Sequence, residues 1–457
     1  MEEKAKRKIL SQGRELLLLV RKYFNSYIFY GVTSVIACLF VLFNQEVTGV
    51  ITFVGLLCVL LVVCDDILPT TLPFLLLCAI ATNCYDSFHT FIGYAVYAPI
   101  VATALITHFV VYHKPYKSGA SVTGICAVSC ALLLGGIGSF TLKQYAYGAY
   151  YVLGLGVGML VCYYAMKSQF SVQRTYDVKS RFAVIMTLMG AVCVLMILIG
   201  YARTSLDLST STERGFSRNN LSTLLMFSMP FPLYKTKKKD FGALLTLFFF
   251  GGICLTTSRG GLIFGGVEFL ICCVYWICSS NRKKQRLAYC LIAGAILFLG
   301  VGGVVIDVIK DRILSDNAIV GSVRHDMIIE AIERFRKRPI FGSGLLDNSI
   351  AYGEYRKAGT MAWYHMMIPQ IVGSMGLIGV CAYLFQGIGR IKLIVTDKND
   401  WSLILGISYL GILLMSQVNP GEFCPLPFEL LTVLLFILQE ERLDERKLPL
   451  LRNLKRV

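Results

Sequence analysis

The chain has 457 residues, of which 56% are hydrophobic and only 16% are charged. A soluble chain of this size would contain about a quarter charged residues, so the composition excludes an ordinary soluble globular protein. The net charge of +16 comes from basic residues scattered among many short segments, and this argues against a nucleic-acid-binding protein.

Apolar runs follow one another along the chain, and each is roughly 17–23 residues long, enough to cross a bilayer core as a helix. We distinguish about 12–14 such runs and therefore expect an all-α, polytopic transmembrane helical bundle. The expected organisation is a cytoplasmic amphipathic leader at 1–23, about eleven spans within 24–306, a large extracytoplasmic loop with a helix at 307–364, about three spans within 365–438 and a basic cytoplasmic tail at 439–457.

The first residues, MEEKAKRKILSQGRELLLLVRKYF, are basic and amphipathic, which predicts a helix on the cytoplasmic face of a membrane. Lys and Arg gather in alternate segments between the apolar runs, such as YKTKKKD and SNRKKQR. The positive-inside rule places these segments in the cytoplasm. Both termini are then predicted to be cytoplasmic, and loop 307–364 to be extracytoplasmic.

The stretch LTTSRGGLIFGG puts Arg259 near the middle of a long apolar run, 241–280, whose other charge is Glu268. A helix of that length would span about 60 Å, twice a bilayer core, so the run predicts two spans. Gly260 and Gly261 are expected to form the turn between them. Arg259 then lies at the outer turn of a helical hairpin, where it either snorkels to lipid phosphates or binds a ligand.

Within the long loop, SVRHDMIIEAIERFRKRPIFGSG predicts a helix that begins near Ser322 and ends before Pro339. Helical periodicity predicts an apolar face made of Met327, Ile328, Ala331, Ile332 and Phe335.

Arg324 falls near the centre of that predicted face. A buried guanidinium needs a counter-charge, so Arg324 is expected to bind either a phosphate or an internal carboxylate. The later basic residues are expected to be solvated or to face lipid headgroups: Arg334, Arg336, Lys337 and Arg338.

Two further outer segments carry polar side chains at the start of a span. TERGFSRNNLS contains Arg214, Arg218, Asn219 and Asn220, which either cap a helix and meet headgroups or bind phosphate or sugar. WYHMMIPQIVGSMGLIG contains His365, whose ordinary pKa of about 6.5 suits proton abstraction near neutral pH, although a structural role is the alternative.

In this order the motifs resemble the O-antigen ligase and O-antigen polymerase superfamily of bacterial membrane glycosyltransferases, over roughly 203–385. The resemblance implies a GT-C-like fold and a donor glycan on undecaprenyl diphosphate that is used at the extracytoplasmic face. By motif match, His365 is the catalytic residue, and Arg259 and Arg324 bind the substrate diphosphate; Arg218 and Arg214 are further candidates for that binding. Family members often place a small or polar residue after the histidine, and Met366 departs from this pattern.

These features predict an inverting membrane glycosyltransferase of the bacterial inner membrane that polymerises lipid-linked oligosaccharide units of a surface polysaccharide. No metal and no cofactor are expected, because the Asp65–Asp66 pair lies on the predicted inner side and no nucleotide-binding motif occurs outside the spans. The expected partners are an undecaprenyl-diphosphate-linked oligosaccharide donor, a glycan acceptor and the lipid bilayer, with a flippase and a chain-length regulator, and no nucleic acid.

Two other functions remain open at this point. One is a ligase that moves the glycan onto lipid A core or another envelope acceptor. The other is a flippase or transporter of lipid-linked sugars, which should carry charges at several depths of its lumen. The sequence predicts essentially one deep ionisable residue, Glu268, and this disfavours the flippase.

Overall fold

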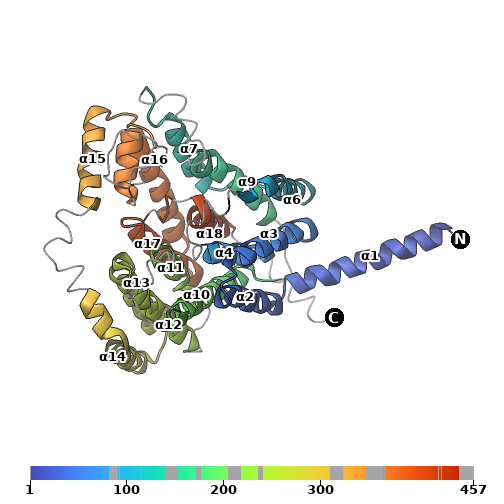
Figure 1. The fold of residues 1–457 in the computed structure, drawn as a ribbon, viewed down its shortest axis with the longest axis horizontal. Helices are drawn as coiled ribbons and strands as arrows, with labels where there is room; N and C mark the ends of the chain where they lie inside the picture. The colour runs from blue at the N-terminus through green and yellow to red at the C-terminus, as the bar shows by residue number, and fades with distance from the viewer. Residues whose placement is uncertain are drawn as a thin grey trace. The chain divides into compact units, whose positions relative to one another are not determined.

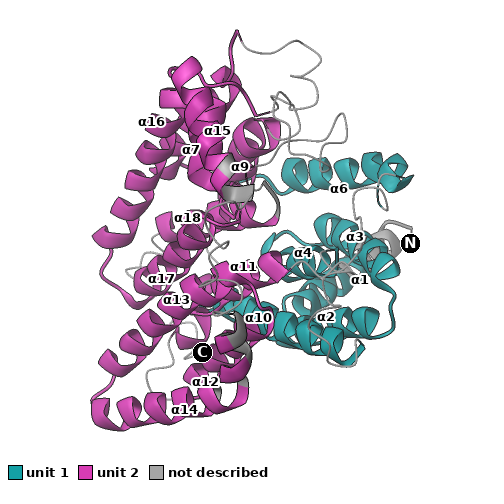
Figure 2. Ribbon diagram, turned by 60° about the vertical axis from the view of Figure 1, so that its left-hand side comes forward, with its two compact units in different colours: residues 1–114, 180–217 teal, residues 115–179, 218–457 magenta. Residues whose placement is uncertain are grey.

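In a computed structural model of the chain, the described residues are 2–81, 91, 93–114, 116–138, 152–170, 176–203, 218–234, 240–308, 323–345, 364, 366–419, 421–423 and 425–441. All regular structure within these ranges is helical, and they contain no strand. This confirms the expected all-α fold. The chain divides into two compact units, which Figure 2 shows in different colours.

Unit 1 comprises residues 1–114 and 180–217. Its helices are α1 (Glu2–Phe24), α2 (Tyr27–Leu42), α3 (Glu46–Val63), α4 (Leu68–Ala81), the 3-10 helix η1 (Gly93–Tyr97), α6 (Ala98–Val111) and most of α10 (Val178–Arg203). Helix α1 covers the basic leader, and Figure 1 shows it extending away from α2 and α3. Arg21 anchors its last turn by donating to the Val63 carbonyl at 2.8 Å and pairing with Asp65 at 3.2 Å.

Unit 2 comprises residues 115–179 and 218–457. Its α-helices are α7 (Ser121–Leu134), α9 (Met159–Phe170), α11 (Arg218–Ser228), α12 (Phe241–Leu255), α13 (Arg259–Cys278), α14 (Lys283–Val308), α15 (Val323–Lys337), α16 (Met367–Thr396), α17 (Asp400–Met415) and α18 (Leu430–Glu440). Short 3-10 or π elements are η2 (Gly154–Gly158), η4 (Phe231–Leu233) and η7 (Pro425–Glu429). The predicted loop helix is α15, which lies beside α16, and the predicted hairpin is α12 and α13 (Figure 1).

Within the described residues, five helices are long and apolar enough to cross a membrane: Glu46–Val63, Gly93–Val111, Val178–Arg203, Arg259–Cys278 and Met367–Thr396. A sixth span is added if Gln12–Phe24 and Tyr27–Leu42, which are bent by 60°, act as one. Shorter apolar helices lie at Leu68–Ala81, Ser121–Leu134, Phe241–Leu255 and Asp400–Met415. The chain is therefore a multi-pass helical membrane protein, and the total of about 12–14 spans stays a prediction.

Helix α16 is broken at Gly376, where φ is 60° and ψ is −149°. The segment 339–344, which follows α15, fills the break with backbone hydrogen bonds. They run from the N–H groups of Leu377 and Ile378 to the carbonyls of Pro339 and Ile340 (2.8 and 3.2 Å), and from the N–H groups of Ser343 and Gly344 to the carbonyls of Gly373 and Ser374 (2.9 and 2.8 Å). Because backbone polar groups inside a membrane must be satisfied within the protein, these bonds make the break tolerable.

Replacing Gly376 with alanine is expected to destabilise the protein by about 1–3 kcal/mol or more, because φ is left-handed and an ideal Cβ would lie 2.5 Å from the Pro339 carbonyl oxygen. Thermal unfolding in detergent measures the effect. Gly387→Ala, in the same helix, is the matched control, because its Cβ would meet nothing within 4 Å. It should be neutral or slightly stabilising, and equal losses in both variants would contradict this account of the break.

Glu268 is not the one ionisable residue that is buried within the described helices. Glu268 is fully buried in α13, and neither of its carboxyl oxygens has a hydrogen-bond partner among the described residues. Arg390 of α16 is buried as well, together with Glu422 and Glu429. The sequence gives no local sign of this burial, because a charge usually ends an apolar run and the carboxylate partners of Arg390 lie 32 and 39 residues further along the chain.

Candidate functional site

The turn between α12 and α13 carries the hairpin arginine. Residues 256–258 join the two helices, and Thr257 among them has a φ of 53°, which is unusual for a β-branched residue. Ser258 caps α13, because its Oγ accepts a hydrogen bond from the Gly261 N–H at 3.2 Å. Arg259 is exposed at the amino terminus of α13, where the helix dipole also favours an anion.

The glycines after Arg259 do not make the turn, contrary to the sequence expectation. Gly260 and Gly261 lie in the first turn of α13, and their role is close packing. An ideal Cβ at Gly260 would overlap Val418, and one at Gly261 would lie 2.8 Å from the Ser222 Oγ. The chain reverses at Thr257 instead, so two neighbouring segments can approach the arginine-bearing turn.

Helix α11 brings the predicted Arg–Asn motif to this turn. Arg218 donates from Nη1 to the Thr257 Oγ1 at 2.9 Å, and the Ser258 hydroxyl donates to the Asn219 Oδ1 at 2.8 Å. Each pair is separated by 39 residues in the sequence. Two motifs that the sequence predicts independently therefore form one polar cluster that contains both Arg218 and Arg259.

A residue that sequence analysis missed completes this cluster. Asn419 lies between α17 and α18 and is 6% exposed. Its Nδ2 donates to the Asn220 Oδ1 at 3.4 Å and to the Thr223 Oγ1 at 3.3 Å. The sequence signal was available, because SQVNPGEF places an asparagine before a Pro–Gly pair in a short segment between two apolar runs. We call the set the arginine cluster: Arg218, Asn219, Asn220, Thr223, Thr257, Ser258, Arg259 and Asn419.

The same inter-helix segment, 416–423, also reaches the start of α16. The Ser416 carbonyl accepts a hydrogen bond from the Met367 N–H at 2.8 Å. Met367 is two positions after His365 in the sequence. Segment 416–423 therefore contacts the arginine cluster with one residue and the helix that follows the predicted histidine with another.

Helix α15 contacts Tyr364, the residue that lies just before the start of α16. Tyr364 donates its N–H to the Gln370 Oε1 at 2.9 Å and its hydroxyl to the Glu330 Oε1 at 3.2 Å. Glu330 in turn pairs with Arg334 at 2.8 Å. The residue before position 365 is thus fixed by side chains from both α15 and α16.

The expectation that Arg334 is solvated is wrong. It is 7% exposed, and its guanidinium carbon lies 5.8 Å from the centroid of the Tyr364 ring. Ile328 and Ile332, which were expected on the packed face, are 41% and 44% exposed. Helix α15 is rotated so that Ala331 packs against Gly373 of α16, and Glu330 supplies the counter-charge that burial of Arg334 requires. The remaining basic residues are exposed, as expected: Arg336, Lys337 and Arg338.

The structure describes some of the predicted site residues fully, one by its backbone alone and two not at all. Arg218 and Arg259 have described side chains and belong to the arginine cluster. Arg324 lies in α15, and its side chain is outside the described part of the chain. Arg214 and His365 lie outside the described residues, so their roles stay predictions.

Chemically, the arginine cluster combines two guanidinium groups, a helix amino terminus and several hydroxyl and amide groups. Planar guanidinium groups and helix amino termini both suit phosphate oxygens, so the arrangement favours an anionic ligand. Within the described ranges, no group of three or more His, Cys, Asp or Glu side chains could hold a metal ion. This observation does not test whether the reaction needs a metal, so metal independence stays a prediction.

The central part of the chain matches a known protein family. Residues 244–384, less than half of the chain, match the family model described as O-Antigen ligase. The matched segment contains Arg259, Arg324 and position 365, together with most of the α12–α13 hairpin, α15 and the first part of α16. No match emerges from comparison with curated proteins or with solved structures. This match supports membership of the O-antigen ligase and O-antigen polymerase superfamily, which the order of the motifs predicts.

Proposed function

We propose that the protein transfers a glycan from undecaprenyl diphosphate to an acceptor sugar hydroxyl, and that it polymerises lipid-linked oligosaccharide units of a surface polysaccharide. The family match supports O-antigen-type glycan transfer in general. One observation carries the finer proposal. Arg218, which is distant from Arg259 in the sequence, donates a hydrogen bond to Thr257 in the turn just before Arg259, and Arg259 is exposed at that turn.

The arginines would act on the leaving group. As the glycosidic bond breaks, negative charge builds on the diphosphate oxygen. A guanidinium grips phosphate oxygens through two parallel hydrogen bonds and keeps its charge at every relevant pH. Arg259 and Arg324 would bind the diphosphate and stabilise this charge in the transition state, with Arg218 and Arg214 as further contacts.

His365 would act on the acceptor. Its imidazole takes the proton of the acceptor hydroxyl while the hydroxyl oxygen attacks the anomeric carbon. The bond from that carbon to the diphosphate oxygen breaks, and the diphosphate leaves on the opposite face. Attack from that side inverts the configuration. The chemistry needs no metal, because arginines supply the positive charge that a divalent cation would otherwise provide.

A ligase is the second candidate, and the description of the matched family favours it. The two functions differ in the acceptor alone. The protein in lipid nanodiscs, given a lipid-linked oligosaccharide and excess chelator, should produce a ladder of longer lipid-linked chains if it is a polymerase. A single transfer that occurs only when lipid A core is added would identify a ligase. Donor that crosses the bilayer without any new glycosidic bond would replace both proposals with a flippase.

We also propose that the reaction takes place at the extracytoplasmic face of the bacterial inner membrane, with both termini in the cytoplasm. A cysteine at position 354, in loop 307–364, is then expected to react with an impermeant maleimide added to intact cells or spheroplasts. A cysteine at position 445, in the basic tail, should react only after the membrane is permeabilised. Reversed accessibility of the two positions would overturn this orientation.

A further inference from the structure

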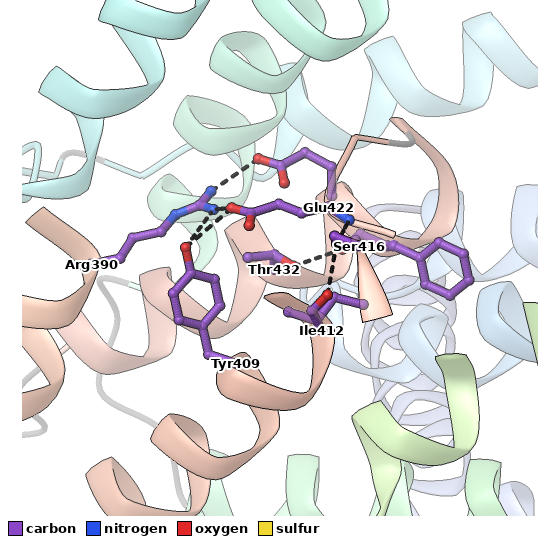
Figure 3. A network of polar contacts seen from close by, with 8 residues as sticks. Arg390, Tyr409, Ile412, Ser416, Glu422 and Thr432 are labelled. Carbon is purple, nitrogen blue, oxygen red and sulfur yellow. Dashed lines mark hydrogen bonds and ion pairs between the residues drawn. The ribbon is translucent and has the colours of Figure 1, made fainter. Parts of the chain in front are cut away.

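A network of three charged side chains, Arg390, Glu422 and Glu429, is buried in unit 2 between α16, α17 and the start of α18. Figure 3 shows the Arg390 guanidinium pointing toward Glu422 and Tyr409. Arg390 donates from Nη1 to the Glu422 Oε1 and from Nη2 to the Glu429 Oε1, the latter at 2.9 Å. The Tyr409 hydroxyl donates to the same Glu422 oxygen at 3.2 Å. Arg390 and Glu422 are each 2% exposed, so one guanidinium ties three parts of the chain together away from solvent.

Stability does not explain this group. Burying ions costs more desolvation energy than their attraction usually returns, and an apolar core of equal volume is often as stable or more so. Here the network also leaves atoms unsatisfied. The second carboxylate oxygens of Glu422 and Glu429, and the Nε of Arg390, have no hydrogen-bond partner among the described residues. What such a group provides is a defined geometry, because a planar fork holds two carboxylates in fixed directions.

The buried group of Arg390, Glu422 and Glu429 fixes the conformation of segment 416–423. Glu422 is in this segment, and its N–H donates to the Ser416 Oγ at 2.7 Å, which brings the two ends of the segment together. From this loop, Asn419 reaches the arginine cluster and the Ser416 carbonyl reaches Met367 at the start of α16. The buried charges therefore hold a described segment that contacts both the arginine cluster and the start of α16.

We propose that Arg390 is a positioning residue for glycan transfer. Through Glu422 and Glu429 it holds segment 416–423 where Asn419 orders the arginine cluster and Ser416 orders the start of α16. This inference rests on the proposed function, and it adds residues from the last third of the chain, outside the segment that matches the family. A displacement of about 1 Å at a catalytic group costs up to roughly 100-fold in rate, so the network acts on the rate without contacting the substrate.

Arg390→Lys is the principal test, because lysine keeps the charge and loses the fork that spans both carboxylates. We expect kcat to fall about 10- to 100-fold, while KM for the lipid-linked donor changes less than about threefold. Tyr409→Phe removes the phenol hydrogen bond to Glu422 and the longer one that the phenol accepts from Arg390 at 3.5 Å, and it should lower kcat about two- to tenfold. If Arg390→Lys does not fold, Tyr409→Phe tests the same network. Glu429→Gln, which still accepts from the guanidinium, should retain most of the activity.

The matched control is Lys167, another buried cation of unit 2, which pairs with Glu440 at 3.2 Å and Glu441 at 2.8 Å. Lys167→Met should lower the temperature of unfolding, and kcat per folded molecule should stay at the wild-type value. A loss of kcat in Lys167→Met as large as that in Arg390→Lys would show that any buried ion pair has this effect, and would overturn the proposal.

Hydrogen exchange separates this inference from the proposed function, because it needs no turnover. Amides in 416–423 should exchange faster in Arg390→Lys than in the wild type, and at the wild-type rate in Lys167→Met. Unchanged exchange in Arg390→Lys would refute the positioning role even if activity fell. Faster exchange in a protein whose wild type transfers no glycan would refute the proposed function and the role in catalysis, and would leave only the structural link.

Discussion

Replacing His365 with alanine is expected to lower glycan transfer by about 10²–10⁴-fold, because a positioned general base contributes that much to a rate. Donor binding should change little, because the arginines hold the diphosphate. His365→Gln can still form hydrogen bonds, yet it cannot take up a proton near neutral pH, and we expect it to be about as inactive. Turnover of a purified lipid-linked oligosaccharide, with donor binding measured separately, checks both expectations.

His89→Ala serves as the control for this histidine experiment. The positive-inside rule puts the segment that contains His89 on the same side of the membrane as His365. His89 lies outside the described residues and has no proposed role, so its alanine variant should be fully active. Near-normal turnover by His365→Gln would reduce the histidine to an orienting role. Activity that chelator removes and a divalent metal restores would exclude the metal-free mechanism.

Arg324→Lys is expected to reduce kcat about 10²–10³-fold, the size of effect seen when one preorganised donor to a transition-state charge is lost. Lysine retains the charge but cannot bind two phosphate oxygens in one plane. By helical spacing, position 324 shares the stripe of Met327 and Ala331, which face the packed side of α15. Arg259→Lys should have a similar effect, because Arg259 is exposed at the amino terminus of α13.

Arg336→Lys is the matched control for Arg324→Lys, because Arg336 is exposed on the same helix. Steady-state kinetics of the two variants should differ by at least about tenfold. Equal rates would show that the position of an arginine on α15 is unimportant. Tighter donor binding by Arg259→Lys than by the wild type would contradict its role at the diphosphate.

Local sequence signals predicted the elements of the site well. The apolar runs and their breaks indicate a hairpin near Arg259, and a capping residue followed by helical periodicity and then Pro339 indicates α15. Both elements occur, as α12–α13 and as α15 from Val323 to Lys337. Such signals are local, because capping and periodicity involve residues within one or two helical turns.

The rotation of α15 was not predictable in the same way. Helical periodicity outlines an apolar stripe but does not say which side of it packs, and Ile328 and Ile332 lie on the exposed side of the stripe whereas Met327 and Ala331 lie on the buried side. The pair Glu330–Arg334, four residues apart, was a usable signal that Arg334 has a local counter-charge. Its burial under Tyr364, however, depends on a residue 30 positions beyond Arg334 that no local pattern connects to it.

The arginine cluster illustrates the same limit. The sequence indicates that Arg218 and Arg259 each lie at the start of a helix, but the contact of Arg218 with Thr257, just before Arg259, depends on how α11 packs against the α12–α13 turn. Asn419 and Arg390 were missed because their contacts come from residues distant in sequence. A polar residue in a short loop, or a charge at the end of an apolar run, has many ordinary explanations when it is read without its neighbours.

The broken helix α16 has a consequence for biosynthesis. Inside a bilayer, each unsatisfied backbone group costs several kcal/mol, so α16 is poorly tolerated there until the groups around Gly376 find partners. Those partners are in 339–344, which the ribosome makes before α16. The partner segment has therefore already been synthesised when α16 is inserted, and the groups around Gly376 need no residue that is made later. A chain divided between 345 and 364 and produced as two separate fragments would lose that order, and its second fragment would have to insert α16 with these backbone groups unpaired.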